Sequence, residues 1–125
     1  MLKKILVVDD EPYIVKTLAA RLKANGFDVF TANDGVQGFA KVKEVMPDLI
    51  IVDVMMPNMD GPTMVENLRS ESSTSHIPVI FLTALVKKEE EKAQKNLIGG
   101  NYFMAKPYNP TELLIMVKKL LDKKD

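Results

Sequence analysis

Residues 49–61 read LIIVDVMMPNMDG, a short apolar run that ends in an aspartate and is followed by a loop rich in turn-forming residues. A continuous run of four apolar residues with such a boundary is typical of a strand buried on both faces of a sheet. Asp53 comes directly after this run, where an unpaired buried charge would cost several kcal/mol. We therefore expect Asp53 to meet other polar groups at the end of the strand.

Similar short apolar runs recur along the chain and alternate with longer stretches that have helical spacing. The predicted strands are residues 5–8, 27–30, 49–52, 79–82 and 102–104. This alternation is typical of parallel strands joined by crossover helices. It predicts an α/β fold with one doubly wound, five-stranded parallel sheet and five helices, in a single domain of residues 1–125. The second run carries Asp28, which suits an edge strand.

Glycine and proline mark the predicted helix boundaries. Asn25-Gly26 and Met46-Pro47 predict the ends of the first two helices. Gly61-Pro62 and Pro110 predict the starts of the third and last helices, because proline is tolerated in a first turn. Residues 86–98 have only a narrow apolar stripe, which predicts a fourth helix that is charged and mostly exposed to solvent.

Composition and charge exclude several classes of protein. The chain has 125 residues, 46% of them hydrophobic, with 17 Lys+Arg against 17 Asp+Glu and no Cys. The absence of Cys excludes disulfides and thiolate metal sites. A net charge of zero argues against direct binding of nucleic acid, because that mode needs excess cations. The longest apolar run, residues 113–117, is too short to cross a membrane, so we expect a cytoplasmic protein without membrane insertion.

Unusual polar residues follow the predicted strands. Asp9 and Asp10 end the first, Asp53 the third and Thr83 the fourth, and Lys106 follows the fifth. In open parallel sheets, ligands bind at the carboxyl ends of the strands. Oxygen ligands without His or Cys favour a hard divalent cation such as Mg²⁺. A metal, a lysine, a hydroxyl and a carboxylate facing one opening suit a phosphoryl group.

Each of these features also has a plain structural interpretation. The run from Asp9 to Pro12 could be no more than an acidic helix N-terminus. Thr83 could be a hydroxyl bonded to backbone, and Lys106 a loop charge before a rigid Lys-Pro turn. The joint arrangement favours the functional interpretation, because all of these residues occur at strand carboxyl ends.

The same residues resemble the receiver domain of two-component response regulators, and the resemblance covers the whole chain. Residues 5–12, ILVVDDEP, resemble the opening acidic motif of that family, and residues 53–61, DVMMPNMDG, resemble its phosphoacceptor loop. Thr83-Ala84 and residues 102–107, YFMAKP, match the remaining two signatures in order and spacing. The resemblance implies a flavodoxin-like fold with strand order 2-1-3-4-5.

The resemblance also implies a magnesium-dependent phosphoacceptor site. Asp53 would accept a phosphoryl group from the phosphohistidine of a histidine kinase. Asp10 and Asp53 would bind Mg²⁺ directly, Asp9 would bind it through a water molecule, and the backbone carbonyl of Met55 would complete the protein ligands.

The remaining signatures imply a switch that responds to phosphorylation. Lys106 would pair with a phosphoryl oxygen, and Thr83 would hydrogen-bond another and be drawn toward it. Tyr102 would turn inward as Thr83 leaves its space. The peptide bond before Pro107 would be cis, as is usual in the family.

The resemblance extends to the partners of the chain. They would be a sensor histidine kinase or phosphotransfer protein, and a downstream protein bound at the face of the fourth helix, fifth strand and fifth helix. Ile115, an apolar residue among charged ones on the last helix, could mark that face or a homodimer contact formed on phosphorylation. We expect a stand-alone regulator, since no output domain follows the last predicted helix.

Some residues depart from the family pattern or carry no role in it. Met55 stands where many relatives have a polar side chain near the attacking water, and a thioether cannot orient water as a carboxylate or amide could. Leu85 makes the mouth of the pocket more apolar. His76, the single histidine, is expected to be a solvated loop residue.

Three other functions fit these residues less well than a phosphoacceptor switch does. Haloacid-dehalogenase-type phosphatases also use an aspartate after a strand with Mg²⁺, but they need a second acid two residues later, where this chain has Met55. A flavodoxin-like nucleotide binder would have its phosphate repelled by residues 9–11. A non-phosphorylated interaction module would have no need of all the acidic, hydroxyl and lysine positions.

Overall fold

A twisted, mostly parallel sheet forms the centre of the computed structural model, which describes residues 1–84, 97–98 and 101–122. The order of strands is β2-β1-β3-β4-β6-β5. The five parallel strands are β1 (Lys4–Val8), β2 (Asp28–Ala32), β3 (Leu49–Asp53), β4 (Val79–Thr83) and β6 (Asn101–Ala105). These are the five predicted strands, and the predicted order 2-1-3-4-5 is confirmed for them. The strand with Asp28 lies at an edge, as predicted.

A sixth strand corrects the prediction for residues 86–98. Leu97–Ile98 form β5, which pairs antiparallel with β6 at the other edge of the sheet. The predicted helix therefore does not extend to Ile98, and residues 86–96 lie outside the described residues. A two-residue strand has no measurable period, so the sequence does not distinguish its apolar residues from the end of a helical stripe.

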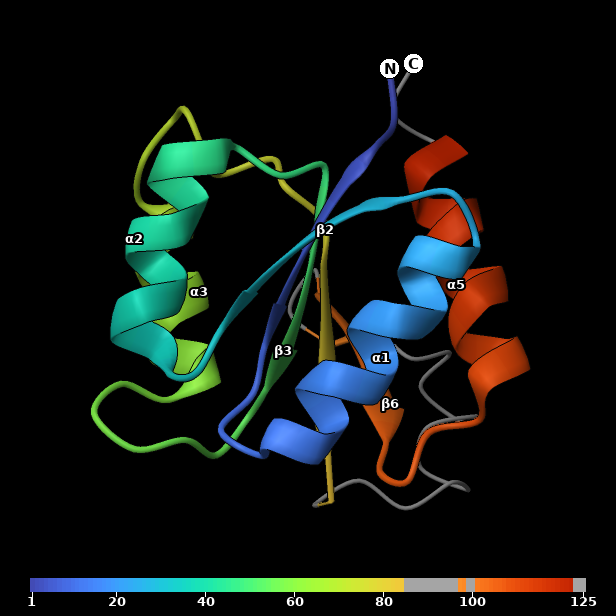
Figure 1. Ribbon diagram of the computed structural model, residues 1–125. Helices are drawn as coiled ribbons and strands as arrows, with labels where there is room; N and C mark the ends of the chain where they lie inside the picture. The colour runs from blue at the N-terminus through green and yellow to red at the C-terminus, as the bar shows by residue number, and fades with distance from the viewer. Residues whose placement is uncertain (85–96, 99–100, 123–125) are drawn as a thin grey trace.

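Helices cover both faces of the sheet. The described ranges contain four helices rather than the five predicted, namely α1 (Pro12–Ala24), α2 (Gly35–Val45), α3 (Gly61–Arg69) and α5 (Pro110–Asp122). Figure 1 shows α1 and α5 together on one side of the sheet and α2 and α3 together on the other. No helix in these ranges is long and apolar enough to cross a membrane.

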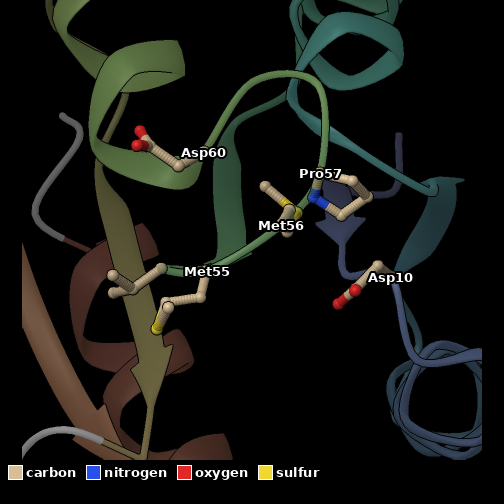
Figure 2. Close-up of a pocket in the computed structure, with 6 residues that line it drawn as sticks. Asp10, Met55, Met56, Pro57 and Asp60 are labelled. Carbon is tan, nitrogen blue, oxygen red and sulfur yellow. The ribbon is translucent and has the colours of Figure 1, made fainter.

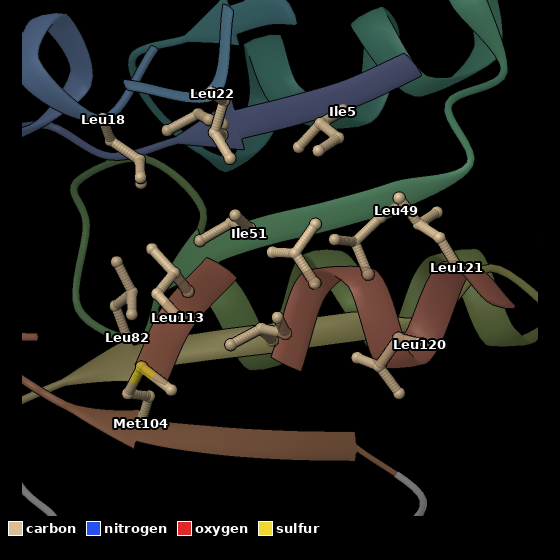
Figure 3. Close-up of a cluster of buried hydrophobic side chains, with 13 residues drawn as sticks. Ile5, Leu18, Leu22, Leu49, Ile51, Leu82, Met104, Leu113, Leu120 and Leu121 are labelled. Atoms are coloured by element: carbon tan, nitrogen blue, oxygen red, sulfur yellow. The ribbon is translucent and has the colours of Figure 1, made fainter. Parts of the chain in front are cut away.

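The alternation of side chains along the strands produces two separate cores. On β1, for example, Ile5 and Val7 point to one face, and Leu6 and Val8 point to the other. The first set joins the α1/α5 core, which Figure 3 shows as a packed layer of mostly aliphatic side chains between α5 and the strands. The second set joins the α2/α3 core. Because the central strands are apolar on both faces, they require helices on both faces, which explains the doubly wound fold.

The helices begin and end at the predicted signals. Asn25 caps the end of α1, and Met46, in the left-handed conformation, ends α2. Proline occupies the first turn of α1 and of α3. Asp34 and Asp60 provide side-chain N-caps for α2 and α3. The strand ends are thereby connected to the helices by short, well-defined loops, which fixes where the polar residues after each strand lie.

Candidate functional site

The carboxyl ends of the parallel strands bring the predicted polar residues together at one edge of the sheet. Val8 of β1 pairs with Val52 of β3, so Asp9, which follows β1, lies at the level of Asp53, the last residue of β3. Thr83, the last residue of β4, pairs with Ala105, so Lys106 extends just beyond it. The backbone N–H of Lys106 also donates a hydrogen bond to the carbonyl of Thr83 over 2.9 Å.

The ammonium of Lys106 joins three carboxylates. Its Nζ lies 2.9 Å from Asp9 Oδ2, 3.1 Å from Glu11 Oε1 and 3.3 Å from Asp53 Oδ1. The lysine is mostly buried, as are Asp9 and Asp53, whereas the Glu11 side chain is 58% exposed. Sequence reasoning placed Lys106 and Asp53 at one opening, and the structure has a contact between them. It did not assign a role to Glu11.

The acidic residues after β1 contact Lys106 in addition to preceding the N-terminus of α1. Asp9 Oδ1 accepts a hydrogen bond from the backbone N–H of Glu11 over 2.9 Å. Glu11 occupies the N-cap position of α1, but its side chain makes no capping hydrogen bond. Both side chains instead contact Lys106 across a separation of more than 90 residues. The bond between Lys106 and Pro107 is cis.

Burial and like charge shift the pKa values of the site. Burial raises the pKa of the Asp9 carboxyl above its usual value, although the Glu11 amide and the Lys106 ammonium act in the opposite direction. Burial also raises the pKa of Asp53, and the negative charge of Asp9 adds to the effect. Burial lowers the pKa of Lys106, but its contacts with Asp9, Glu11 and Asp53 outweigh that effect and raise it overall. The cluster therefore holds more negative charge than one lysine balances.

The same carboxylates have the chemistry of a divalent cation site. One oxygen each from Asp9, Asp10, Glu11 and Asp53 lies within 4.8 Å of the others. Asp9 Oδ2 is buried, and its contact with Lys106 is an ion pair without hydrogen-bond alignment, since no donor among the described residues satisfies it. The ion pair offsets the charge of this oxygen, and an added cation or a water molecule bound to it would complete the contacts of the oxygen. Carboxylate oxygens suit Mg²⁺, so the residues fit that ion.

Two adjoining pockets open onto this cluster. One, of about 240 Å³, is lined by Asp10, Glu11, Asp53, Met55, Thr83, Ala84 and Lys106. The other, of about 420 Å³, is lined by Asp10, Val54, Met55, Met56, Pro57 and Asp60. Figure 2 shows Asp10 facing Met55 and Met56 across the second pocket. The smaller pocket contains the predicted acceptor, hydroxyl and lysine, so it is the candidate phosphoryl site. The carbonyl of Met55 as a metal ligand stays a prediction.

The loop after β3 is held close to the acceptor. The amide of Asn58 donates a hydrogen bond to Asp34 Oδ2 over 2.6 Å, and the N–H of Gly61 donates to the carbonyl of Val54 over 3.0 Å. A Cβ atom on Gly61 would lie 2.2 Å from the backbone oxygen of Asp53. Only glycine fits so close to the end of β3, and the loop therefore leaves the acceptor carboxylate open to the pocket.

The structure does not bring Tyr102 to Thr83. Tyr102 packs against the α1/α5 core, whereas Phe103 packs against the α2/α3 core and stacks on Phe81 with ring centroids 5.0 Å apart. Thr83 comes two residues after Phe81 on β4, so the two side chains share one face of the sheet. Phe103 is therefore the aromatic residue of β6 on the face of Thr83. Sequence reasoning missed it because 102 and 103 are both aromatic, and only the register with β4 separates them.

Three further residues from the sequence analysis, Met55, Ile115 and His76, are exposed, and for His76 the predicted solvated loop position is confirmed. Met55 is 66% exposed and lines both pockets. Ile115 is 61% exposed on α5. His76 is exposed in the loop before β4, whose chain enters the sheet at the end opposite to the acidic cluster. Leu85 lies outside the described residues.

Comparisons with known proteins agree with this geometry. Residues 5–118 match the family model of the response regulator receiver domain. The alkaline phosphatase synthesis transcriptional regulatory protein PhoP of Bacillus subtilis is 42% identical over 97% of this chain and 49% of its own length. The DNA-binding dual master transcriptional regulator RpaA of Synechocystis is 38% identical over 98% of this chain and 50% of its own length. The chain thus spans about half the length of these curated relatives.

A solved structure with the same fold carries a metal. The receiver domain of a sensor histidine kinase from Pseudomonas aeruginosa PAO1 has a magnesium ion coordinated in its active-site cleft. It is 26% identical to this chain, with a TM-score of 0.84 and coverage of 98% of this chain and 99% of that one.

Proposed function

Because the chain belongs to the response regulator receiver domain family, we propose that it is a phosphorylation-dependent signalling switch whose phosphoacceptor is Asp53. The observation that carries the proposal is the Lys106 ammonium, which lies between Asp9 and Asp53 in a pocket that also contains Thr83. Receiver domains are phosphoacceptors rather than enzymes with a separate turnover substrate, and we extend this to residues 1–125 as one receiver domain.

The proposed reaction transfers a phosphoryl group from a phosphohistidine to Asp53. A carboxylate oxygen of Asp53 forms the new bond to phosphorus while the bond from phosphorus to the donor nitrogen breaks, and the electron pair of that bond returns to the imidazole. Charge on the transferred group spreads over its peripheral oxygens, so catalysis is mainly positioning and charge stabilisation. Lys106 pairs with one of these oxygens, and the hydroxyl of Thr83 hydrogen-bonds another.

Asp9, Asp10 and Asp53 are the proposed holders of Mg²⁺, with the carbonyl of Met55 as a further ligand. When bound, Mg²⁺ supplies positive charge that offsets the carboxylates and the phosphoryl oxygens. The buried Oδ2 of Asp9 supports this assignment, because its only close cation among the described residues is Lys106. The magnesium ion in the Pseudomonas receiver domain supports it by analogy.

The proposed switch couples Thr83 to Phe103 rather than to Tyr102. Phosphorylation draws the hydroxyl of Thr83 toward the acceptor. The movement leaves room beside Thr83 on the face of the sheet that it shares with Phe103. Phe103 is half-buried on the same face and lines a cavity of about 300 Å³ beside α3. A change in its position would alter the surface near β6. Phosphorylation adds about −1.5 to −2 units of charge, which is sufficient to bias such a rearrangement.

The proposed partners follow from this role. A sensor histidine kinase or phosphotransfer protein supplies the phosphoryl group, and a downstream protein or a second copy of the chain binds the face formed by β6 and α5, where Ile115 is exposed. The cytoplasmic location and the absence of direct nucleic-acid binding stay predictions. The two relatives named as transcriptional regulators are about twice as long as this chain.

One experiment separates this function from its rivals. Incubation with acetyl phosphate and Mg²⁺ should add one phosphoryl group to the wild type and none to Asp53→Asn, as measured by intact mass. Asp28→Asn is the matched control, because Asp28 is exposed at the opposite end of the sheet and should be labelled like the wild type. Labelling of Asp53→Asn would contradict the assignment of the acceptor. Release of inorganic phosphate without any accumulation of phosphorylated wild-type protein would indicate a hydrolase instead.

A further inference from the structure

Glu11 differs from the other carboxylates that contact Lys106. Asp9 and Asp53 are buried, with side-chain exposed fractions of 2% and 9%, whereas that of Glu11 is 58%. Its Oε1 nevertheless lies 3.1 Å from the lysine Nζ. Glu11 therefore contacts the buried ammonium from the outer rim of the pocket.

The backbone of Glu11 is fixed on both sides, which directs the side chain toward the pocket. Its N–H donates to Asp9 Oδ1 over 2.9 Å, and its carbonyl accepts from the N–H of Val15 over 3.1 Å. The side chain does not cap α1, although Glu11 occupies the N-cap position. A capping role thus does not explain the position of this carboxylate.

The Glu11 carboxylate has two physical consequences for a phosphoryl donor. It occupies a contact of the Lys106 ammonium that a phosphoryl oxygen would need, and it adds negative charge to a pocket that Asp10 and Asp53 also line. A small donor with a high negative charge is repelled more strongly than one with a low negative charge. Because Glu11 is exposed, it can release the lysine without leaving a buried charge unpaired.

We propose that Glu11 is a specificity-determining and positioning residue, which holds Lys106 before phosphorylation and discriminates against phosphodonors of high negative charge. This inference rests on the proposed function. It favours a phosphohistidine with a protonated imidazole, which carries one net negative charge, over an acyl phosphate, which carries two. The other contacts of Lys106, with Asp9 and Asp53, remain in place after Glu11 leaves.

The test compares two small donors, acetyl phosphate, a dianion, and phosphoramidate, a monoanion. Glu11→Gln removes the charge and keeps the shape, so phosphorylation by acetyl phosphate should become about threefold faster, the size expected for a partly exposed charge pair. The logarithm of the effect scales with donor charge, so phosphoramidate should gain only about 1.7-fold. Both gains should decrease at high salt.

Two further variants separate charge from structure. Glu11→Asp keeps the charge and should restore the wild-type ratio of the two rates. Glu44→Gln removes a charge from another exposed ion pair, with Lys41, and should leave both rates unchanged. Calorimetric titration with Mg²⁺ provides a readout that needs no phosphorylation, and Glu11→Gln should bind the ion about threefold more weakly than the wild type, because one nearby negative charge is lost.

The possible failures are distinguishable. If the wild type is labelled on Asp53 but Glu11→Gln changes the two donor rates by the same factor or slows acetyl phosphate, the role of Glu11 is refuted while the proposed function stands. If Glu44→Gln reproduces the effect of Glu11→Gln, the cause is the net charge of the protein and the inference is also refuted. If neither donor labels the wild type, the proposed function itself fails, and with it this inference.

Discussion

Replacing the acceptor should stabilise the metal-free protein, which is the reverse of the usual effect of a buried polar substitution. Two like charges at 4.8 Å repel by about 3.5 kcal/mol at an effective dielectric constant of about 20, and by about a quarter of that in water. Asp53 has three carboxylates within that distance and attracts one ammonium, at 3.3 Å. The three carboxylates outnumber the single ammonium, so the net effect on Asp53 is repulsive. Burial raises the pKa of its carboxyl, and the negative charge of Asp9 adds to that effect, so both disfavour the charged form.

Because the pocket is open to solvent, we expect Asp53→Asn to increase the free energy of unfolding by about 1–3 kcal/mol without metal. Added Mg²⁺ should reduce or reverse this difference in stability between Asp53→Asn and the wild type. At a concentration about 100 times its Kd, a ligand adds about 2.7 kcal/mol to the stability of the protein that binds it. The wild type should gain this amount, while Asp53→Asn, which lacks one carboxylate ligand, should gain less.

The assay is urea unfolding followed by far-UV circular dichroism, which suits a chain without tryptophan. Samples contain either EDTA or MgCl₂ at matched ionic strength and neutral pH. Asp28→Asn is the control for a change in net charge, and its stability should not respond to Mg²⁺ differently from that of the wild type. If Asp53→Asn is less stable than the wild type in EDTA, the cluster does not store repulsion. If Mg²⁺ stabilises both proteins equally, Asp53 is not a ligand of the ion, and either result refutes the reasoning.

Further predictions concern the loops around the site and the exposed face of α5. Met55→Asn should shorten the lifetime of the phosphorylated protein about 2–10-fold by orienting water, whereas Met55→Leu should not, as followed by loss of the phosphoryl group in mass spectrometry. Gly61→Ala should lower the free energy of unfolding by about 1–3 kcal/mol in urea, because its Cβ would collide with the backbone of Asp53. The Gln37 amide and the Asn58 side chain hold the pKa of Asp34 below its ordinary value of 3.8, so this charge contributes stability above that pH, which is lost as the pH falls through the lowered pKa. The wild type should therefore lose more stability than Asp34→Asn in urea unfolding between about pH 5 and pH 3, and equal losses would contradict the role of Asp34. Ile115→Glu should abolish phosphorylation-dependent self-association or partner binding in light scattering, and unchanged binding would exclude this face of α5.

Local apolar patterns predicted the parallel strands because a strand buried on both faces must be apolar throughout. The same patterns did not predict β5, because its two residues are too few to show a period. This strand also pairs antiparallel with β6, unlike the others. The helix predicted over residues 86–98 ended too late for that reason. Helix boundaries at glycine and proline were predicted well, because they depend on the backbone preferences of single residues.

The acidic cluster could be predicted because topology alone brings strand carboxyl ends together. The contact of Glu11 with Lys106 could not, since it joins residues 95 apart and depends on the backbone conformation after β1. The choice between Tyr102 and Phe103 also required the register of β6 against β4. A shift of one residue in the register of a strand moves each of its side chains to the other face of the sheet. The local sequence does not specify this register.

For this chain, the order of residues was enough to define a doubly wound α/β domain and to assign Asp9, Asp53, Thr83 and Lys106 to one site. These assignments depend on hydrophobic period and on strand ends, which are properties of short segments. Only the tertiary structure showed that Glu11 contacts Lys106. Only the tertiary structure showed that Phe103, and not Tyr102, lies on the face of Thr83. Those two results depend on how distant segments align, and alignment is set by the packing of the whole sheet against its helices.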